Sequence, residues 1–107
     1  MLIGNHEVHG KVIDHATRCE HYHSELDIIA IKFACCHAYY PCYRCHQEAA
    51  GHAAKVWPKS AGKMKAILCG NCHRELTIET YKGTNTCPYC HAAFNPDCNL
   101  HYHYYFG

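Results

Sequence analysis

The chain has 107 residues and a formal net charge of +1, and its ten cysteines and twelve histidines contrast with only three phenylalanines and one tryptophan. This length fits one domain or two small lobes, and the many histidines argue against a secreted scaffold held by disulfides. The weak charge, which falls to about −2 if nine thiolates bind three zinc ions, argues against a nucleic-acid-binding protein.

No segment has the pattern of a secretory signal or a membrane helix. The amino-terminal stretch MLIGNHEVHGK lacks a basic region followed by an apolar run. The longest apolar run, IIAIKFACC from Ile28, is interrupted by Lys32 and is far shorter than the roughly 20 residues that a membrane helix needs. We therefore expect a soluble protein without a membrane partner, in a reducing compartment such as the cytoplasm.

The first third of the chain is expected to contain one buried strand. Residues 1–18 resemble an extended lead-in, with Val8, Val12 and Ile13 as its core contacts. Residues 26–33 (LDIIAIKF) are rich in β-branched side chains, which is typical of a buried strand.

A short helix is expected next, over residues 43–50. Gly51 would follow it as the C-cap and turn the chain, so that His52 leaves the face of the helix. The lysine-rich residues 53–66 then resemble a solvated linker.

The second half is expected to form a β-hairpin. Residues 74–81 (RELTIETY) alternate, which would place Leu76 and Ile78 on one face of a strand. Residues 82–85 (KGTN) would form the turn of the hairpin.

Two CxxC pairs in this half give the clearest chemical signal. Cys69 and Cys72 form the first pair, Cys87 and Cys90 form the second, and 14 residues lie between the pairs. Each pair can wrap a turn around one ion, and the spacing is close to the usual four-cysteine zinc pattern. We therefore predict a zinc ribbon, with two disulfides as the less favoured alternative.

The upstream part holds nine further candidate ligands, whereas two tetrahedral zinc sites need eight. The nine residues are Cys19, His21, Cys35, Cys36, His37, Cys42, Cys45, His46 and His52. Three consecutive residues cannot easily all face metal ions, so we leave out the histidine that follows the vicinal cysteines, His37.

The neighbouring residues Cys45 and His46 should serve different ions, because their side chains diverge by about 100° on a helix. Cys42 should share an ion with Cys45. An interleaved arrangement then gives Cys19, His21, Cys42, Cys45 at one site and Cys35, Cys36, His46, His52 at the other.

The alternative arrangement would put four thiolates at one site and one thiolate with three histidines at the other. We favour interleaving because it distributes charge more evenly, but spacing alone leaves the alternative open. Binding of the vicinal Cys35 and Cys36 to one ion also requires a tight bend.

The tail, NPDCNLHYHYYFG, contains further potential ligands. Cys98 and His101 could form half of a fourth site, completed by His73 or His91. We favour a different interpretation, in which the thiol and the histidines pack among the tyrosines of the tail, because a fourth complete ligand set is hard to assemble.

Several of these motifs together resemble the CHY-type zinc finger. The resemblance is carried by Cys19-Glu-His21-Tyr22, the vicinal cysteines, the segment PCYRCH and the late CxxC pairs, and it extends over essentially the whole chain. It implies three zinc ions per domain in the interleaved arrangement.

The family has two kinds of member, which imply different roles. Some carry the domain ahead of a RING finger in ubiquitin ligases, where it helps to bind proteins. No ligand set is left here for a RING, so ligase activity is not expected. Others are small stand-alone proteins, similar to a fungal helper of small-Tim assembly in the mitochondrial intermembrane space and to bacterial relatives. That helper is linked to zinc handling and to thiol oxidation of its partners.

One fragment also matches part of a zinc deaminase signature, H-x-E followed by P-C-x-x-C. It consists of His23, Glu25, Pro41, Cys42 and Cys45. Only 15 residues separate Glu25 from Pro41, and surplus thiols would fill the open position that a catalytic zinc needs. A deaminase-like hydrolase is therefore a remote alternative.

The sequence as a whole predicts a small α+β protein dominated by its metals. A two-zinc module with its linker would occupy residues 1–66, and a zinc-ribbon lobe with an aromatic tail would occupy residues 67–107, in one compact domain. We expect a non-enzymatic module that binds a protein partner. The main alternative is a zinc-handling or thiol-maintenance factor for cysteine-rich proteins.

Overall fold

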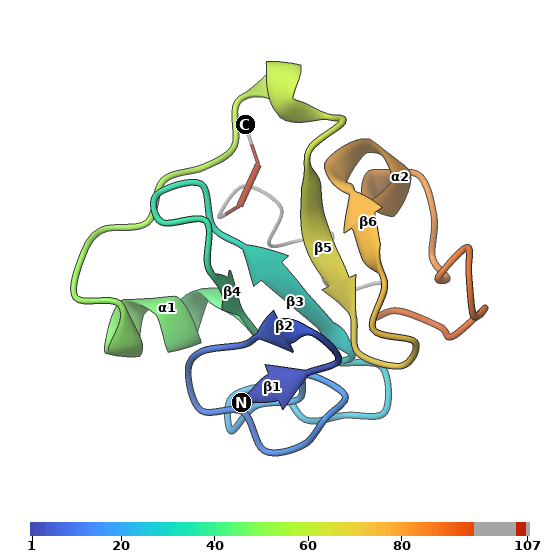
Figure 1. Cartoon of the computed structure of the whole chain (residues 1–107), viewed down its shortest axis with the longest axis horizontal. Helices are drawn as coiled ribbons and strands as arrows, with labels where there is room; N and C mark the ends of the chain where they lie inside the picture. The colour runs from blue at the N-terminus through green and yellow to red at the C-terminus, as the bar shows by residue number, and fades with distance from the viewer. Residues whose placement is uncertain (96–104, 107) are drawn as a thin grey trace.

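The computed structural model describes residues 1–95 and 105–106, and its centre is an antiparallel sheet of four strands in the order β4-β3-β5-β6 (Figure 1). The strands are β3 (Ile29–Lys32), β4 (Tyr39–Tyr40), β5 (Lys65–Cys69) and β6 (Glu75–Thr77). The other elements are β1 (Leu2–Ile3), β2 (His6–Glu7), α1 (Tyr43–Ala49), the 3-10 helix η1 (Lys59–Ala61) and α2 (Ile78–Lys82). Within the described ranges, none of the helices has the length and apolar character needed to cross a membrane.

The strand and the helix predicted in the first half are confirmed as β3 and α1. Helix α1 begins after Cys42, whose sulfur accepts the main-chain N–H of Cys45 at 3.4 Å and so caps the helix. Its last residue is Ala49 and its C-cap is Ala50, so the prediction that Gly51 is the C-cap is wrong by one residue. Gly51 follows with a φ of 70°, a left-handed conformation that suits glycine after a helix.

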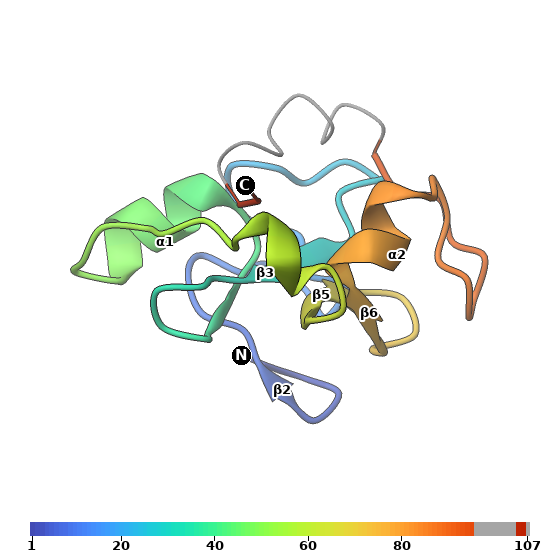
Figure 2. The ribbon, with the colours of Figure 1, turned by 90° about the horizontal axis from the view of Figure 1, so that it is seen from above.

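The central strands separate two apolar cores, because alternate residues of a strand point to opposite faces of the sheet. Ile29, Ile31 and Ile67 belong to the larger core, to which α2 also contributes. Ala30 and Leu68 belong to the smaller core. The β1–β2 hairpin packs on that second face, and Figure 2 shows it on the opposite side of the sheet from α2.

The N-terminal segment contributes more to the core than its sequence suggested. Ile3 and Val8 are both fully buried, and Val12 packs half-buried beside them. The prediction that Ile13 is a core contact is wrong, since that residue is 50% exposed. Val12 pairs with Cys19 in an antiparallel bridge and points inward, so the next side chain points to solvent.

The expected linker, residues 53–66, contains a buried anchor. Trp57 is only 5% exposed, and its indole N–H donates to the carbonyl oxygen of Lys32 at 2.6 Å. Its main-chain N–H donates to the carbonyl oxygen of Tyr105 at 2.8 Å. Trp57 therefore fastens this segment to β3 and to the described end of the chain.

Strand β5 joins the two lobes expected from the sequence. It begins at Lys65 and pairs with β3, with Ile29 opposite Cys69. The expected boundary between residues 66 and 67 therefore lies inside a central strand, and residues of both lobes form one sheet.

The prediction of one strand over residues 74–81 is wrong in its second half. The chain leaves β6 at Thr77 and enters α2 at Ile78. The Thr77 hydroxyl oxygen accepts the main-chain N–H of Thr80 at 3.1 Å, which is a helix N-cap. Ile78 and Tyr81 are both buried, and their three-residue spacing is that of one helix face.

The predicted turn over residues 82–85 is consequently not the turn of a hairpin. The hairpin of this region pairs β5 with β6, and its turn is the loop that carries the first CxxC pair. The second CxxC pair comes after α2, and it reaches the first pair because the helix packs back on β5 and β6.

Gly70 occupies the tightest backbone site of this turn, so we expect Gly70→Ala to destabilise the protein. An added Cβ would lie 2.1 Å from the carbonyl oxygen of Ala16 and 2.8 Å from that of Ile28, and main-chain atoms cannot move aside cheaply. The free energy of unfolding should fall by about 2 kcal/mol or more in denaturant titrations.

The matched control is Gly83→Ala, since the nearest atom to a Cβ there is 3.6 Å away. Its free energy of unfolding should change by no more than about 0.5 kcal/mol. Equal effects of the two substitutions would contradict this account of the turn.

Candidate metal centres

The structure brings twelve cysteine and histidine side chains together in three groups of four. The ligand atoms of each group all lie within 4.8 Å of one another. The first centre is Cys19, His21, Cys42 and Cys45; the second is Cys35, Cys36, His46 and His52; the third is Cys69, Cys72, Cys87 and Cys90. These groups are the interleaved sets and the CxxC set described above.

The spacing of the sulfurs fits a tetrahedral zinc ion. Zn–S bonds of about 2.3 Å at tetrahedral angles place two sulfurs about 3.8 Å apart. The Sγ–Sγ distance is 3.7 Å for Cys69 and Cys90, and 3.8 Å for Cys19 and Cys42. A disulfide would need about 2.05 Å, and the nine described cysteines are free thiols.

Three loops with the same backbone hydrogen bonds present many of these ligands. They are residues 33–38, 69–74 and 87–92. In each loop the N–H of the first residue donates to the carbonyl of the sixth at 2.9–3.0 Å, and the N–H of the fifth donates to the carbonyl of the first at 2.8–2.9 Å. The fifth residue is a histidine with φ between 54° and 65° in every loop.

The loop at residues 33–38 differs from the other two in where its cysteines lie. In the later loops the first and fourth residues are cysteines. Here Phe33 is the first residue, and Cys35 and Cys36 are the third and fourth. The tight bend that the vicinal cysteines require is therefore this loop, which the sequence analysis did not identify.

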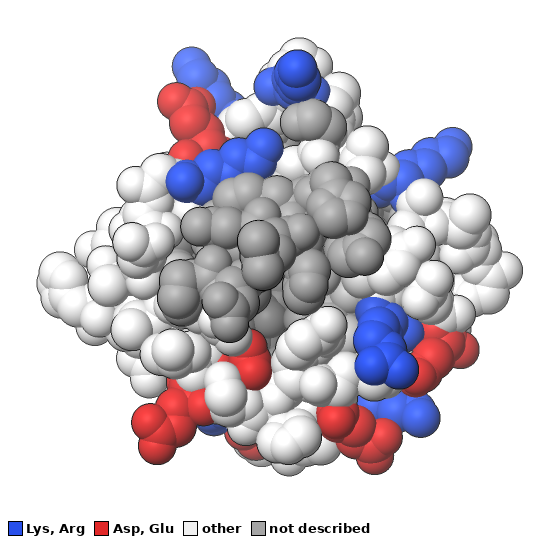
Figure 3. Space-filling view, turned by 180° about the vertical axis from the view of Figure 1, so that it is seen from behind, with Lys and Arg blue, Asp and Glu red and all other residues white. Residues whose placement is uncertain are grey.

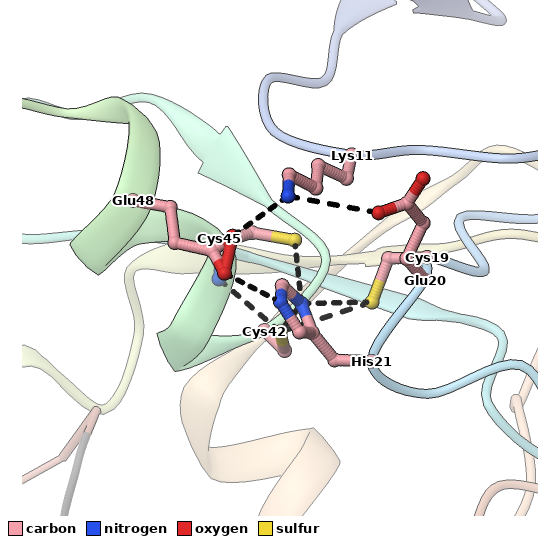
Figure 4. A network of polar contacts seen from close by, with 7 residues as sticks. All are labelled: Lys11, Cys19, Glu20, His21, Cys42, Cys45 and Glu48. Atoms are coloured by element: carbon pink, nitrogen blue, oxygen red, sulfur yellow. Dashed lines mark hydrogen bonds and ion pairs between the residues drawn. The ribbon is translucent and has the colours of Figure 1, made fainter.

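The first centre has a network of hydrogen bonds behind its histidine (Figure 4). The Nδ1 atom of His21 faces the sulfurs of Cys42 and Cys45 at 3.5 and 3.4 Å. Its Nε2 atom lies 2.8 Å from a carboxylate oxygen of Glu48, so the proton belongs on Nε2 and Nδ1 is free for a metal. Lys11 lies 3.6 Å from the same carboxylate and holds it in place.

The thiols of the first centre are too close to ionise together without a cation. Hydrogen bonds with Cys42 and Cys45 lower the pKa of the Cys19 thiol to about 2. The hydrogen bond with Cys19 raises the pKa of Cys42 and raises that of Cys45 to about 11. Three thiolates therefore need a divalent ion among them, which is the environment that a zinc site provides.

The third centre holds its sulfurs by main-chain and side-chain amides. Burial raises the pKa of the Cys69 thiol, although hydrogen bonds from the amides of Cys72 and Asn71 act in the opposite direction. Burial opposes ionisation of Cys90 as well, but the Asn71 side chain and the Ala92 amide lower its pKa to about 6. Cys90 therefore ionises more readily than Cys69, and burial raises the pKa of the Cys72 thiol as well.

The second centre is held mainly by aromatic packing. Nε2 of His46 lies 3.2 Å from the sulfur of Cys35 and 3.9 Å from that of Cys36. Its ring stacks on Phe33 with centroids 4.3 Å apart. Among the described residues, no group forms a hydrogen bond with its buried Nδ1 atom. His52 is exposed, with its ring centroid 4.9 Å from that of His46.

The remaining candidate ligands lie outside the three groups. His37 is exposed, and its ring centroid is 5.2 Å from that of Trp57. The Nε2 atom of His73 lies 3.0 Å from the carbonyl oxygen of His15. His91 is the exposed fifth residue of its loop. The predicted contributions of Cys98, His101 and His103 fall outside the described residues.

Comparison with known proteins identifies the family. Residues 19–95 match the family model of the CHY zinc finger. The chain is a CHY zinc finger protein. Its three tetrads can hold metal ions, in agreement with the zinc of that family.

Fungal relatives are similar to this CHY zinc finger protein over most of its length. A "Helper of Tim protein 13" from Kluyveromyces lactis is 41% identical over 100 residues, covering 94% of this chain and 88% of the relative. One from Saccharomyces cerevisiae is 43% identical over 103 residues, covering 92% and 89%. An uncharacterized protein of Schizosaccharomyces pombe is 41% identical over 99 residues, covering 92% and 88%.

The outer contacts of the first centre are not predicted by the sequence. Lys11 lies before the matched family region and reaches the centre twice, through its ammonium group and through its amide, which donates to the sulfur of Cys45. Its neighbour Gly10 has a φ of 92°, and a Cβ there would lie 2.7 Å from the Cβ of Cys45. In the sequence, Gly10 beside Lys11 is the one sign that the backbone passes close to Cys45.

We expect Glu48→Ala to weaken metal binding at the first centre. Loss of a carboxylate that orients a ligating histidine typically reduces metal affinity by about 10- to 100-fold. Competition with a chelator, read out as zinc retained per chain, measures the change. Glu20→Ala is the control, because the Glu20 carboxylate pairs with the same Lys11 ammonium group at 3.7 Å, whereas Glu48 is the carboxylate that contacts His21. If both variants retain zinc equally, Glu48 does not support the centre.

Proposed function

We propose that this CHY zinc finger protein is a non-catalytic module in which three zinc ions rigidify a surface that binds a protein partner. The proposed zinc ligands are Cys19, His21, Cys42 and Cys45; Cys35, Cys36, His46 and His52; and Cys69, Cys72, Cys87 and Cys90. The observation that carries the proposal is that each group offers four protein ligand atoms within 4.8 Å of one another. The sulfur pairs Cys19–Cys42 and Cys69–Cys90 lie at the separations expected around a tetrahedral ion, 3.8 and 3.7 Å. Structural zinc sites have this closed coordination, whereas catalytic sites keep one position open.

Closed coordination also weighs against the deaminase alternative. The Cys42 and Cys45 of the signature fragment are grouped with Cys19 and His21, which fill the positions that water and a catalytic histidine would take. His23 and Glu25 of the fragment are both exposed and lie outside the group. The arrangement supports metal binding, and Glu25, which would be the general acid of the signature, is not among the grouped side chains.

The distribution of charge supports a protein partner over nucleic acid. In Figure 3, side chains of both signs lie around the rim of the face shown, with basic groups mostly in the upper half and acidic groups mostly in the lower half. Phosphate binding needs a concentration of lysine and arginine, and the formal net charge is only +1.

A second candidate function is zinc handling or thiol maintenance for cysteine-rich proteins. The names of two relatives describe helpers of Tim proteins, and this chain is 41% and 43% identical to them. We extend that role to this chain as the alternative, with a partner of the Tim kind and the mitochondrial intermembrane space as the place of action. A structural observation that favours it is the exposure of Cys36 and His52 at one centre.

Native mass spectrometry tests the ligand sets directly. The wild-type protein should carry three zinc ions. The double variant Cys35→Ser/Cys42→Ser should lose two ions, because its cysteines belong to different centres. The matched double variant Cys19→Ser/Cys42→Ser should lose one, because both cysteines serve the first centre. The reverse result would support the alternative arrangement with four thiolates at one site.

A further inference from the structure

The three centres differ in how well solvent is kept away from their ligands. Three of the four residues of the first centre are buried, and the fourth, His21, has a side chain that is 10% exposed. Two residues of the third centre are buried and two are half-buried. In the second centre only His46 is buried, while Cys36 and His52 are exposed.

The centres also differ in the support of their sulfurs. In the loop at residues 69–74 the first residue, Cys69, is a ligand whose sulfur accepts the amides of Asn71 and Cys72. Phe33 takes that first position in the loop of the second centre, at residues 33–38. The first position of this loop therefore carries a ring instead of a ligand, and the ligands are the third and fourth residues. Of these two, Cys36 accepts the amide of Ala38.

The histidines show the same contrast. A carboxylate, Glu48, fixes the ring of His21 in the first centre at 2.8 Å. The ring of His46 packs against Phe33 and Tyr40, and among the described residues nothing hydrogen-bonds its Nδ1 atom. His52 follows Gly51, which has a left-handed φ of 70°. Apart from its chain neighbours, no described residue places an atom within 4 Å of a Cβ built on Gly51.

We propose that the second centre is the exchange site of the protein, where one zinc ion enters and leaves while the chain stays folded. The inference rests on the ligand sets proposed above and deepens the zinc-handling alternative, because it divides the three ions into one exchangeable and two structural. The partner that fits this site is a molecule with two free thiols, which can approach from the open side formed by Cys36 and His52.

Exchange at this site is a substitution of ligands without a redox change. The two thiols of the acceptor bind zinc as thiolates, and their two protons pass to the sulfurs of Cys35 and Cys36. His46 and His52 leave as neutral imidazoles, and zinc remains divalent. A centre with two thiolates and two imidazoles has no net charge, so no excess negative charge retains the ion, in contrast to the first and third centres.

The fold can survive this loss because other ties hold the same elements. Helix α1 carries His46, but Cys45 in the same helix and Cys42 at its cap belong to the first centre. Phe33 and the loop that follows it remain attached to β3 and the larger core. Only the chain around His52, beyond the helix, loses its attachment.

The test begins with protein that carries three zinc ions per chain and is mixed with the chromogenic chelator 4-(2-pyridylazo)resorcinol. One zinc per chain should be released in a first phase, with no change in circular dichroism. The other two should follow at least about 10-fold more slowly. Loss of the outer contacts of a metal ligand typically weakens metal binding by about 10- to 100-fold, and the lower value is taken here.

Two cysteines at the same position of sister loops provide matched variants. Cys36→Ser should contain two zinc ions and lack the fast phase. Cys72→Ser, at the fourth position of the loop at residues 69–74, should lose a slow ion and keep the fast phase. If Cys36→Ser does not fold, His52→Ala replaces an exposed side chain instead and should accelerate or abolish the fast phase.

The acceptor is tested with a synthetic peptide that contains two reduced cysteines and with the same peptide after alkylation. Only the reduced peptide should take up zinc, at one ion per chain. Uniformly slow release, or a fast phase that persists in Cys36→Ser and disappears in Cys72→Ser, would overturn the exchange site. Fewer than three zinc ions in the starting protein would instead contradict the proposed ligand sets.

Discussion

Sulfur atoms that lie 3.7–3.8 Å apart repel one another once they ionise, and this chain holds several such pairs at buried or half-buried positions. A divalent ion among them converts the repulsion into attraction and ties together loops that are distant in the sequence. Structural zinc sites contribute on the order of 10 kcal/mol or more towards folding. The folded state of a small protein is stabilised by an energy of similar size, so the three tetrads are central to this structure.

The sheet and the centres depend on each other through α1 and the hairpin β5–β6. Helix α1 supplies Cys45 to the first centre and its neighbour His46 to the second. The hairpin turn supplies two ligands of the third centre, and α2 returns the chain so that the last loop supplies the other two. Each centre therefore closes a long-range contact that the short strands alone would hold weakly.

Much of this arrangement could be predicted from local chemistry. The β-branched run around Ile29 forms β3, and adjacent Cys45 and His46 lie in different groups because neighbouring side chains diverge on a helix. Thr77 was misjudged because an alternating pattern and a helix N-cap can share the same residues, and the tertiary contacts of Tyr81 favour the helix.

Other features depend on contacts between distant segments and had no local signal. Trp57 was assigned to a linker because its surroundings are rich in lysine, yet its partner, Lys32, lies on β3. The contact of Glu48 with His21 joins residues that are 27 positions apart. The similarity of the loops at residues 33–38 and 69–74 was hidden because Phe33 stands where the later loops have cysteine.

The most direct test of the metal-dependent fold is a comparison of amide proton dispersion by NMR before and after zinc removal, with all thiols kept reduced. A strong chelator that removes all three ions should collapse the spectrum to that of an unfolded chain, and added zinc should restore it. A metal-free, fully reduced sample that keeps the dispersed spectrum would contradict the central role of the ions.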